Sequence, residues 1–204
     1  MLHPLAKPIA LICVLLPLAW LVWGAFADTL GPNPAEALIR RGGDWTLRFL
    51  CLTLAITPLR EATGWQSVAR FRRMAGLTTF CYGVLHFLCY AWLDKGFVFA
   101  DIVKDIGKRP FILVGSAALL TMLPLALTSF NRAIKALGAA RWRLLHRLVY
   151  ATALLALLHF FWMRAGKNDF QEVAVYAVVM AGLLGWRLWR RMVSRPPRTG
   201  GVKR

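Results

Sequence analysis

The stretch RFRRMAGLTTFCYGVLHFLCY, residues 70–90, decides the fold of this 204-residue chain. After the arginines at its start, no charged residue occurs between Arg73 and Asp94. Those twenty residues are mostly apolar, and a run of that length can cross the hydrocarbon core of a bilayer as a helix. The pattern therefore predicts a transmembrane helix near residues 74–93, with one histidine, His86, inside it.

Uncharged apolar blocks recur along the chain and predict further spans of the same kind. Two blocks near the C-terminus are short, but Arg and Trp side chains that reach the interface can extend them. Of all residues 58% are hydrophobic and 17% are charged, whereas a typical soluble domain has ~25% charged residues. We therefore expect an all-α membrane protein, a six-transmembrane helix bundle with spans near residues 8–27, 44–59, 74–93, 110–129, 147–163 and 173–190.

The distribution of Lys and Arg orients this bundle. With the N-terminus in the cytoplasm, the inside segments hold seventeen of the 26 basic residues and the outside loops hold eight. Because cytoplasmic loops of membrane proteins carry such an excess, both termini are expected inside, with residues 191–204 as a basic cytoplasmic tail. The net charge of +17 then reflects topology in the lipid membrane, and binding to nucleic acid is not expected.

Residues 1–27 allow two interpretations. An early lysine, an apolar run and the sequence Ala25-Phe26-Ala27 resemble a cleavable signal peptide, but the run is longer than the usual ~7–15 residues. We therefore predict a retained first helix, and the topology after Asp28 is the same in both cases. No internal repeat is obvious in the sequence.

Two histidines lie at the same depth in different predicted helices. His86 follows Arg73 by thirteen residues, about 20 Å along a helix, and His159 follows Arg147 by twelve, about 18 Å. Ionisable side chains inside a membrane are costly and are usually functional, although a lone histidine can also simply bond to a neighbouring helix. Neutral imidazoles that face each other across a gap are suited to axial ligation of haem iron. We predict that this pair ligates one haem in the outer half of the bilayer.

Small and charged residues border the same level. Gly76 and Gly83 lie nearly in line on the helix of His86, which suits a flat macrocycle close to the backbone but also suits ordinary helix packing. Arg48 lies one turn from Asp44, so it forms either a surface ion pair with that carboxylate or a contact to a haem propionate.

A third histidine, His146, lies at the predicted cytoplasmic edge. It precedes His159 by thirteen residues and lies on a different face of an ideal helix, so the two cannot bind one iron. His146 is level with Arg72 and Arg73. It is a candidate ligand for a second haem, a candidate contact for a quinone or a flavin, or a plain interfacial residue.

Three stretches together resemble a known family: residues 70–90 quoted above, residues 43–60 (GDWTLRFLCLTLAITPLR) and residues 141–162 (RWRLLHRLVYATALLALLHFFW). They are similar to the YedZ/MsrQ proteins. These are the haem-binding membrane subunits of the bacterial periplasmic methionine-sulfoxide reductase system, within the wider ferric-reductase-like transmembrane group. The resemblance covers roughly residues 8–190.

The resemblance implies an inner-membrane cytochrome that holds haem b and also uses FMN. Electrons would pass from the quinone pool, or from a cytosolic flavin reductase, to a separate periplasmic molybdopterin subunit that reduces methionine sulfoxide in oxidised proteins. His86 and His159 match the axial-ligand positions, and His146 matches the third histidine. The wider group has a fourth histidine where Arg72 or Arg73 stands here, which leaves a second haem open.

Two other functions are alternatives to this one. The first is a stand-alone quinol-linked ferric reductase or cytochrome b of the same fold, and the second is a non-redox six-span transporter that uses His and Arg. The loops between the spans are too brief to hold a flavin or nucleotide domain, which argues against a self-sufficient reductase. The nearly neutral loops at residues 94–110 and 164–172 are the predicted docking surface for the catalytic partner.

Overall fold

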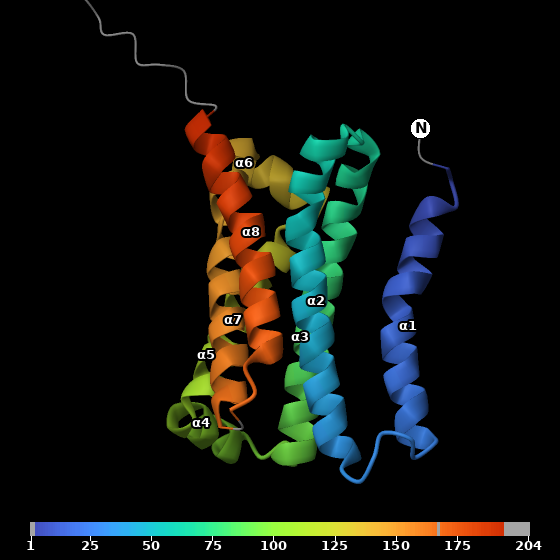
Figure 1. The fold of residues 1–204 in the computed structure, drawn as a ribbon, viewed down its shortest axis with the longest axis vertical. Coiled ribbons are helices and arrows are strands. Elements are labelled where there is room, and N and C mark those ends of the chain that lie inside the picture. The colour runs from blue at the N-terminus through green and yellow to red at the C-terminus, as the bar shows by residue number, and fades with distance from the viewer. Residues whose placement is uncertain (1–2, 167, 194–204) are drawn as a thin grey trace, which may run out of the picture.

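The computed structural model describes residues 3–166 and 168–193, which form a bundle of long helices standing side by side (Figure 1). The long helices are α1 (Ala6–Phe26), α2 (Pro34–Thr63), α3 (Arg72–Cys89), α5 (Pro110–Leu127), α7 (Leu148–Ala165) and α8 (Gln171–Val193). The shorter ones are η1 (Gln66–Phe71), η2 (Tyr90–Asp94), α4 (Phe99–Lys108) and α6 (Asn131–Leu145). The described part of the chain contains no β-strand, so the predicted all-α class is confirmed.

The bundle has two ends, which we call the α4 end and the α6 end after the short helix found at each. Helix α1 begins and α8 finishes at the α6 end (Figure 1). Residues 194–204, most of the predicted basic tail, lie outside the described residues.

Five of the long helices are long and apolar enough to cross a membrane: α1, α3 together with η1 and η2, α5, α7 and α8. Helix α2 is not among these five, and it carries several charged residues, among them Arg40, Asp44 and Arg48. It nevertheless has 30 residues and packs along α3. The six predicted spans therefore correspond to six long helices, one of which is too polar to be recognised by composition.

The bounds of α2 differ most from the prediction. The sequence places this span near residues 44–59, whereas the helix begins at Pro34 and ends at Thr63. Its start is fixed by Asn33, whose side chain accepts a hydrogen bond from the Glu36 backbone N–H at 3.1 Å. Its end is fixed by Gly64, whose φ of 71° is a left-handed conformation that glycine adopts without strain.

Large apolar side chains cover the outside of the bundle. Phe26 of α1, Leu120 of α5 and Val178 of α8 are 87%, 66% and 73% exposed, and many similar side chains accompany them. Soluble monomers rarely expose apolar patches of this extent, whereas lipid tails are a favourable solvent for them. The chain is an integral membrane protein.

Helix α4 was not predicted and gives the segment 94–110 a defined structure. Its Ile102 is buried in a cluster with Tyr90 and Ile112. On its polar side, Asp105 accepts hydrogen bonds from the Tyr90 hydroxyl at 2.6 Å and from Arg109 Nε at 2.7 Å. The Arg109 guanidinium lowers the pKa of the Asp105 carboxyl to about 2, so this carboxylate stays charged and paired at neutral pH.

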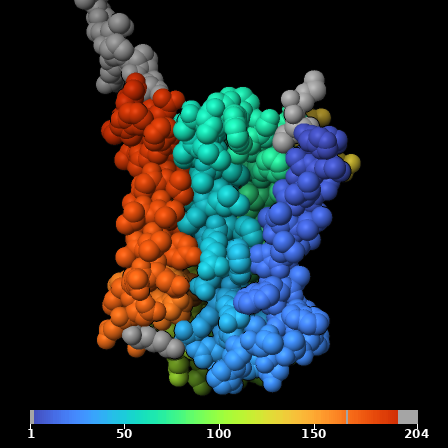
Figure 2. Space-filling model, turned by 45° about the vertical axis from the view of Figure 1, so that its right-hand side comes forward, coloured from blue at the N-terminus to red at the C-terminus, as the bar shows by residue number. Residues whose placement is uncertain are grey.

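Helix α1 lies on the outside of the bundle against α2 (Figure 2) and is fastened to α3 by one side chain. The Tyr82 hydroxyl donates a hydrogen bond to the Val14 carbonyl at 2.7 Å and accepts one from the Leu18 N–H at 3.1 Å. It is thus inserted into the backbone ladder of α1, beside Pro17. The ring of Tyr82 packs on Phe49 and Val14 in the same buried cluster.

We expect Tyr82→Phe to loosen α1, because the ring stays packed while both hydrogen bonds to α1 are lost. Each bond contributes about 1 kcal/mol, and α1 can partly re-form its own ladder, so the free energy of unfolding should fall by about 1 kcal/mol. Thermal melting in detergent, with limited proteolysis between α1 and α2, measures the effect. Tyr176→Phe is the control, because it removes a hydroxyl of α8 that accepts a hydrogen bond from Arg48 of α2 rather than from α1. Equal proteolysis of Tyr82→Phe and wild type would contradict the fastening role.

Candidate functional site

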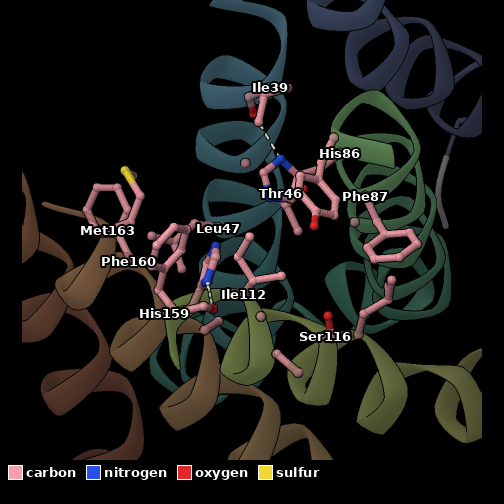
Figure 3. Close-up of a pocket in the computed structure, with 18 of the residues that line it drawn as sticks. Ile39, Thr46, Leu47, His86, Phe87, Ile112, Ser116, His159, Phe160 and Met163 are labelled. Carbon is pink, nitrogen blue, oxygen red and sulfur yellow. Dashed lines mark hydrogen bonds between the residues drawn. The ribbon is translucent and has the colours of Figure 1, made fainter. Parts of the chain in front are cut away.

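Helices α2, α3, α5 and α7 enclose a cavity of about 170 Å³ whose lining includes both intramembrane histidines (Figure 3). The ring centroids of His86 and His159 are 6.1 Å apart, and the ring planes are inclined by 70°. The structure thus brings together the two histidines that the sequence placed at one depth. Most of the remaining lining is apolar, which suits a hydrophobic prosthetic group.

Each imidazole is fixed by a backbone carbonyl of a neighbouring helix. The Nδ1 atom of His86 lies 2.9 Å from the Ile39 carbonyl oxygen, and that of His159 lies 2.6 Å from the Phe111 carbonyl oxygen (Figure 3). A carbonyl oxygen only accepts hydrogen bonds, so Nδ1 carries the proton in both rings. In this tautomer Nε2 keeps a free lone pair, as metal-ligating histidines require. Among the described residues, no hydrogen bond occupies Nε2 of either ring.

Two glycines face the histidine rings at close range. A Cβ atom on Gly43 would lie 3.1 Å from His86 Cε1, and one on Gly115 would lie 2.7 Å from His159 Nδ1. A methyl group at Gly115 would therefore collide with the ring. Sequence reasoning selected Gly76 and Gly83 instead. Gly83 does line this cavity, whereas Gly76 lines a second one.

The helix pair α2–α3 and the helix pair α5–α7 build the two sides of the cavity in the same way. Helix α2 corresponds to α5, and α3 with η2 corresponds to α7. Each lining residue of α2 or α3 has a counterpart in the lining later in the chain, and the number of residues between them is constant for each pair of corresponding helices. The matched pairs include Ile39 and Phe111, Gly43 and Gly115, Leu47 and Leu119, His86 and His159, Phe87 and Phe160, and Tyr90 and Met163. The structure therefore contains an internal repeat that was not obvious in the sequence, because the identical pairs lie far apart in the chain and are separated by residues that differ.

Threonine pairs fasten the same two helix pairs deeper in the bundle. The hydroxyl oxygens of Thr53 and Thr79 are 3.2 Å apart across α2 and α3, and those of Thr121 and Thr152 are 2.8 Å apart across α5 and α7. Thr79 and Thr152 are both buried, and each precedes its histidine by two helical turns. Each histidine therefore lies on a helix that also contacts its partner helix through a buried threonine.

The geometry fits a single metal ion between the rings. Bonds of about 2 Å from a metal to imidazole nitrogen place two opposed ring centroids about 6 Å apart, close to the observed separation. The cavity also contains one orphaned polar atom, since Ser116 Oγ is buried without a hydrogen-bond partner. Buried polar atoms normally have partners, so this hydroxyl is a further sign that a group belongs here.

A second cavity, of about 500 Å³, lies nearer the α6 end and has a different character. Its lining includes the cationic side chains of Lys7, Arg70, Arg72 and Arg73, together with His146. The structure thus brings His146 close to the two arginines that the sequence placed at its level. The buried side chain of Met122 lines both cavities and separates them.

The ring of His146 is held within this second cavity. It stacks on Trp142 with centroids 3.9 Å apart, and its Nε2 lies 3.1 Å from the Thr128 hydroxyl. Partial burial and the nearby positive charge of Arg72 lower the pKa of His146. His146 is therefore neutral at neutral pH. Its counterpart in the internal repeat is Arg73, which donates a hydrogen bond to Asn131 at 2.7 Å.

The structure does not bring Arg48 to the histidine cavity. Its guanidinium lies 4.7 Å from the Trp45 ring, and its Nε donates to the Tyr176 hydroxyl at 3.3 Å. Two turns earlier on α2, Arg40 lines the cavity in its place. Sequence reasoning missed Arg40, because the predicted span began beyond it.

Comparison with known proteins agrees with this arrangement. Residues 43–157, which include all of α3 and α5, most of α2 and the first part of α7 up to two residues before His159, match the family described as "Ferric reductase like transmembrane component". The fold and the paired histidines thus define a ferric-reductase-like membrane protein. No solved structure matches the chain.

Curated relatives narrow this class further. A protein of Polaromonas naphthalenivorans (strain CJ2) named "Protein-methionine-sulfoxide reductase heme-binding subunit MsrQ" is 60% identical, over 98% of this chain and 94% of its own length. Proteins with the same name from Ralstonia nicotianae and Bordetella pertussis are 52% and 50% identical, over 92% and 91% of this chain and 86% and 91% of their own lengths. The chain belongs to the MsrQ family.

We expect Gly115→Ala to destabilise the protein, because the new methyl group would collide with His159. Overpacking of this kind costs about 1–3 kcal/mol, which should appear as a lower melting temperature in detergent. Gly182→Ala on α8 is the matched control, because a Cβ there meets nothing within 4 Å. A melting temperature of Gly115→Ala equal to that of the control would show that the ring is not tightly held.

Proposed function

We propose that this chain is the b-type cytochrome subunit of a methionine-sulfoxide reductase system and holds one haem b between His86 and His159. The observation that carries the proposal is the pair of imidazoles whose Nδ1 atoms are satisfied by carbonyls and whose centroids are 6.1 Å apart. The relatives that this chain resembles over nearly its full length are named haem-binding subunits, which supports the same assignment.

The chain would supply two iron ligands, hold the haem in position and surround it with mostly apolar side chains. A bound haem supplies one-electron redox chemistry. The carbonyl bonds at Nδ1 raise the basicity of both imidazoles and fix the orientation of the rings that would hold the haem iron. The mostly apolar side chains of α2, α3, α5 and α7 would surround the group. With both His86 and His159 bound to its iron, a haem here would suit electron transfer and not substrate activation.

The acceptor in this proposal is a periplasmic molybdopterin-containing subunit that reduces methionine sulfoxide in oxidised proteins. The relatives' names support a methionine-sulfoxide reductase as partner. The α4 end would face the periplasm and the α6 end the cytoplasm, as the excess of Lys and Arg indicates. The histidine cavity lies toward the α4 end, so α4 and the segment 164–172 are the proposed docking surface.

The donor in this proposal is the quinone pool or a cytosolic flavin reductase, and FMN is the proposed second cofactor. The second cavity supports this side of the relay, because Arg70, Arg72 and Arg73 can pair with a flavin phosphate or hold a quinone carbonyl. We assign one haem to the chain, because the counterpart of His146 is Arg73 and a guanidinium does not ligate iron. Met122 separates the donor cavity from the haem cavity.

Replacing His86 or His159 with Ala should abolish the low-spin b-type absorbance of the purified protein. The pyridine haemochrome assay should give one haem per chain in wild type and much less than one in each variant. His3→Ala is the control, because His3 lies at the exposed start of the chain. A low-spin spectrum retained in both variants would refute the ligand assignment, and a colourless wild-type protein would favour a transporter.

The double variant Arg72→Gln/Arg73→Gln should slow haem reduction by a quinol or a reduced flavin, while haem content stays at the wild-type level. Loss of two charge-assisted contacts is expected to raise the apparent KM for the donor roughly tenfold or more. Stopped-flow absorbance of the reduced haem measures it. Arg132→Gln on the exposed side of α6 is the control. Unchanged kinetics would place the donor site elsewhere.

A further inference from the structure

The internal repeat shows where the haem cavity is asymmetric. Two matched pairs in its lining place a charged residue opposite an uncharged one. Arg40 on α2 corresponds to Ile112 on α5, and Asp44 on α2 corresponds to Ser116 on α5. Both charged groups of the lining therefore belong to α2.

Arg40 differs from its neighbouring arginines in what it contacts. The Arg41 guanidinium lies 4.9 Å from the ring of Trp20 on α1, so it points away from the cavity. Arg48 is held by Trp45 and Tyr176. Within the described part of the chain, Arg40 is the arginine that lines the cavity.

The guanidinium of Arg40 is partly buried and already positioned. Its side chain is 31% exposed, and its Nη2 lies 2.6 Å from a carboxylate oxygen of Glu36, one turn earlier on α2. A guanidinium has five N–H donors in a planar fork. The bridge to Glu36 fixes the side chain at the edge of the cavity and engages Nη2.

A haem b carries two propionate carboxylates on one edge of an otherwise apolar ring. Placing a carboxylate at an apolar wall is unfavourable unless a cation or several donors meet it. Asp44 adds a negative charge to the same wall, one turn from Arg40, which increases the need for a cation there. Arginine forms the strongest such contacts, with two parallel N–H···O bonds.

We propose that Arg40 binds a propionate of the haem and so sets which edge of the macrocycle faces α2. This assignment rests on the proposed function. Arg40 replaces Arg48, which the sequence suggested for this role and which the structure places outside the cavity. The counterpart of Arg40 on α5 is Ile112, which is uncharged. A propionate would therefore meet a cation on the α2 side of the cavity but not on the α5 side.

The test measures the rate at which haem leaves the detergent-solubilised protein for excess apomyoglobin. Arg40→Gln should release haem roughly tenfold faster than wild type, because a charge-assisted contact is lost. Arg40→Lys should lie between the two, since it keeps the charge but not the fork. Arg41→Gln, on the adjacent residue that faces Trp20, should match wild type.

A second measurement separates a propionate contact from a general effect on the fold. When each protein is loaded with the dimethyl ester of haem, which lacks the carboxylates, Arg40→Gln and wild type should release it at the same rate. Faster release from Arg40→Gln with the ester as well, or equal release with ordinary haem, would overturn the assignment of Arg40. Wild-type protein that binds no haem would refute the proposed function itself, which the haemochrome assay reports independently.

Discussion

The arrangement depends on two hydrogen bonds from histidine Nδ1 atoms to backbone carbonyls of neighbouring helices. The bond from His86 to Ile39 joins α3 to α2, and the bond from His159 to Phe111 joins α7 to α5. Each bond settles the tautomer, fixes the ring and leaves Nε2 for a metal. For a histidine ring to reach a backbone carbonyl of the neighbouring helix, the two helices must lie close together at that point. Gly43 and Gly115 provide that approach.

The same histidine–carbonyl contact occurs in both helix pairs, and this repetition explains why the cavity has two similar sides. Two helix pairs, each with a histidine, a facing glycine and a buried threonine contact, enclose one cavity from opposite sides. Positions where the pairs differ carry the specific chemistry. Arg40 opposes an isoleucine at the histidine cavity, and Arg73 takes the place of a histidine at the second cavity. The described residues thus form one cavity with a matched pair of histidines and one basic cavity with a single histidine, His146.

Much of the fold could be predicted from the sequence, because lipid imposes a simple rule. Uncharged apolar runs of about 20 residues become helices that cross the membrane. Helices α1, α3 and α5 follow that rule, and α7 and α8, with shorter uncharged runs, are also long and apolar enough to cross. The rule was less useful for α2, whose charged residues place the true start at Pro34 outside the predicted span. It gave no sign of α4 and α6, since these helices are short and amphipathic and depend on contacts with the bundle for their stability.

The sequence alone determined the membrane class, the long helices and the common depth of His86 and His159, because these follow from apolar length and from a fixed rise per residue. The sequence also gave the level shared by His146, Arg72 and Arg73. Only the tertiary structure decided which side chains face one cavity. The rotation of each helix about its own axis is set by packing against its neighbours, and that rotation brings Arg40 to the histidine cavity and turns Arg48 away from it.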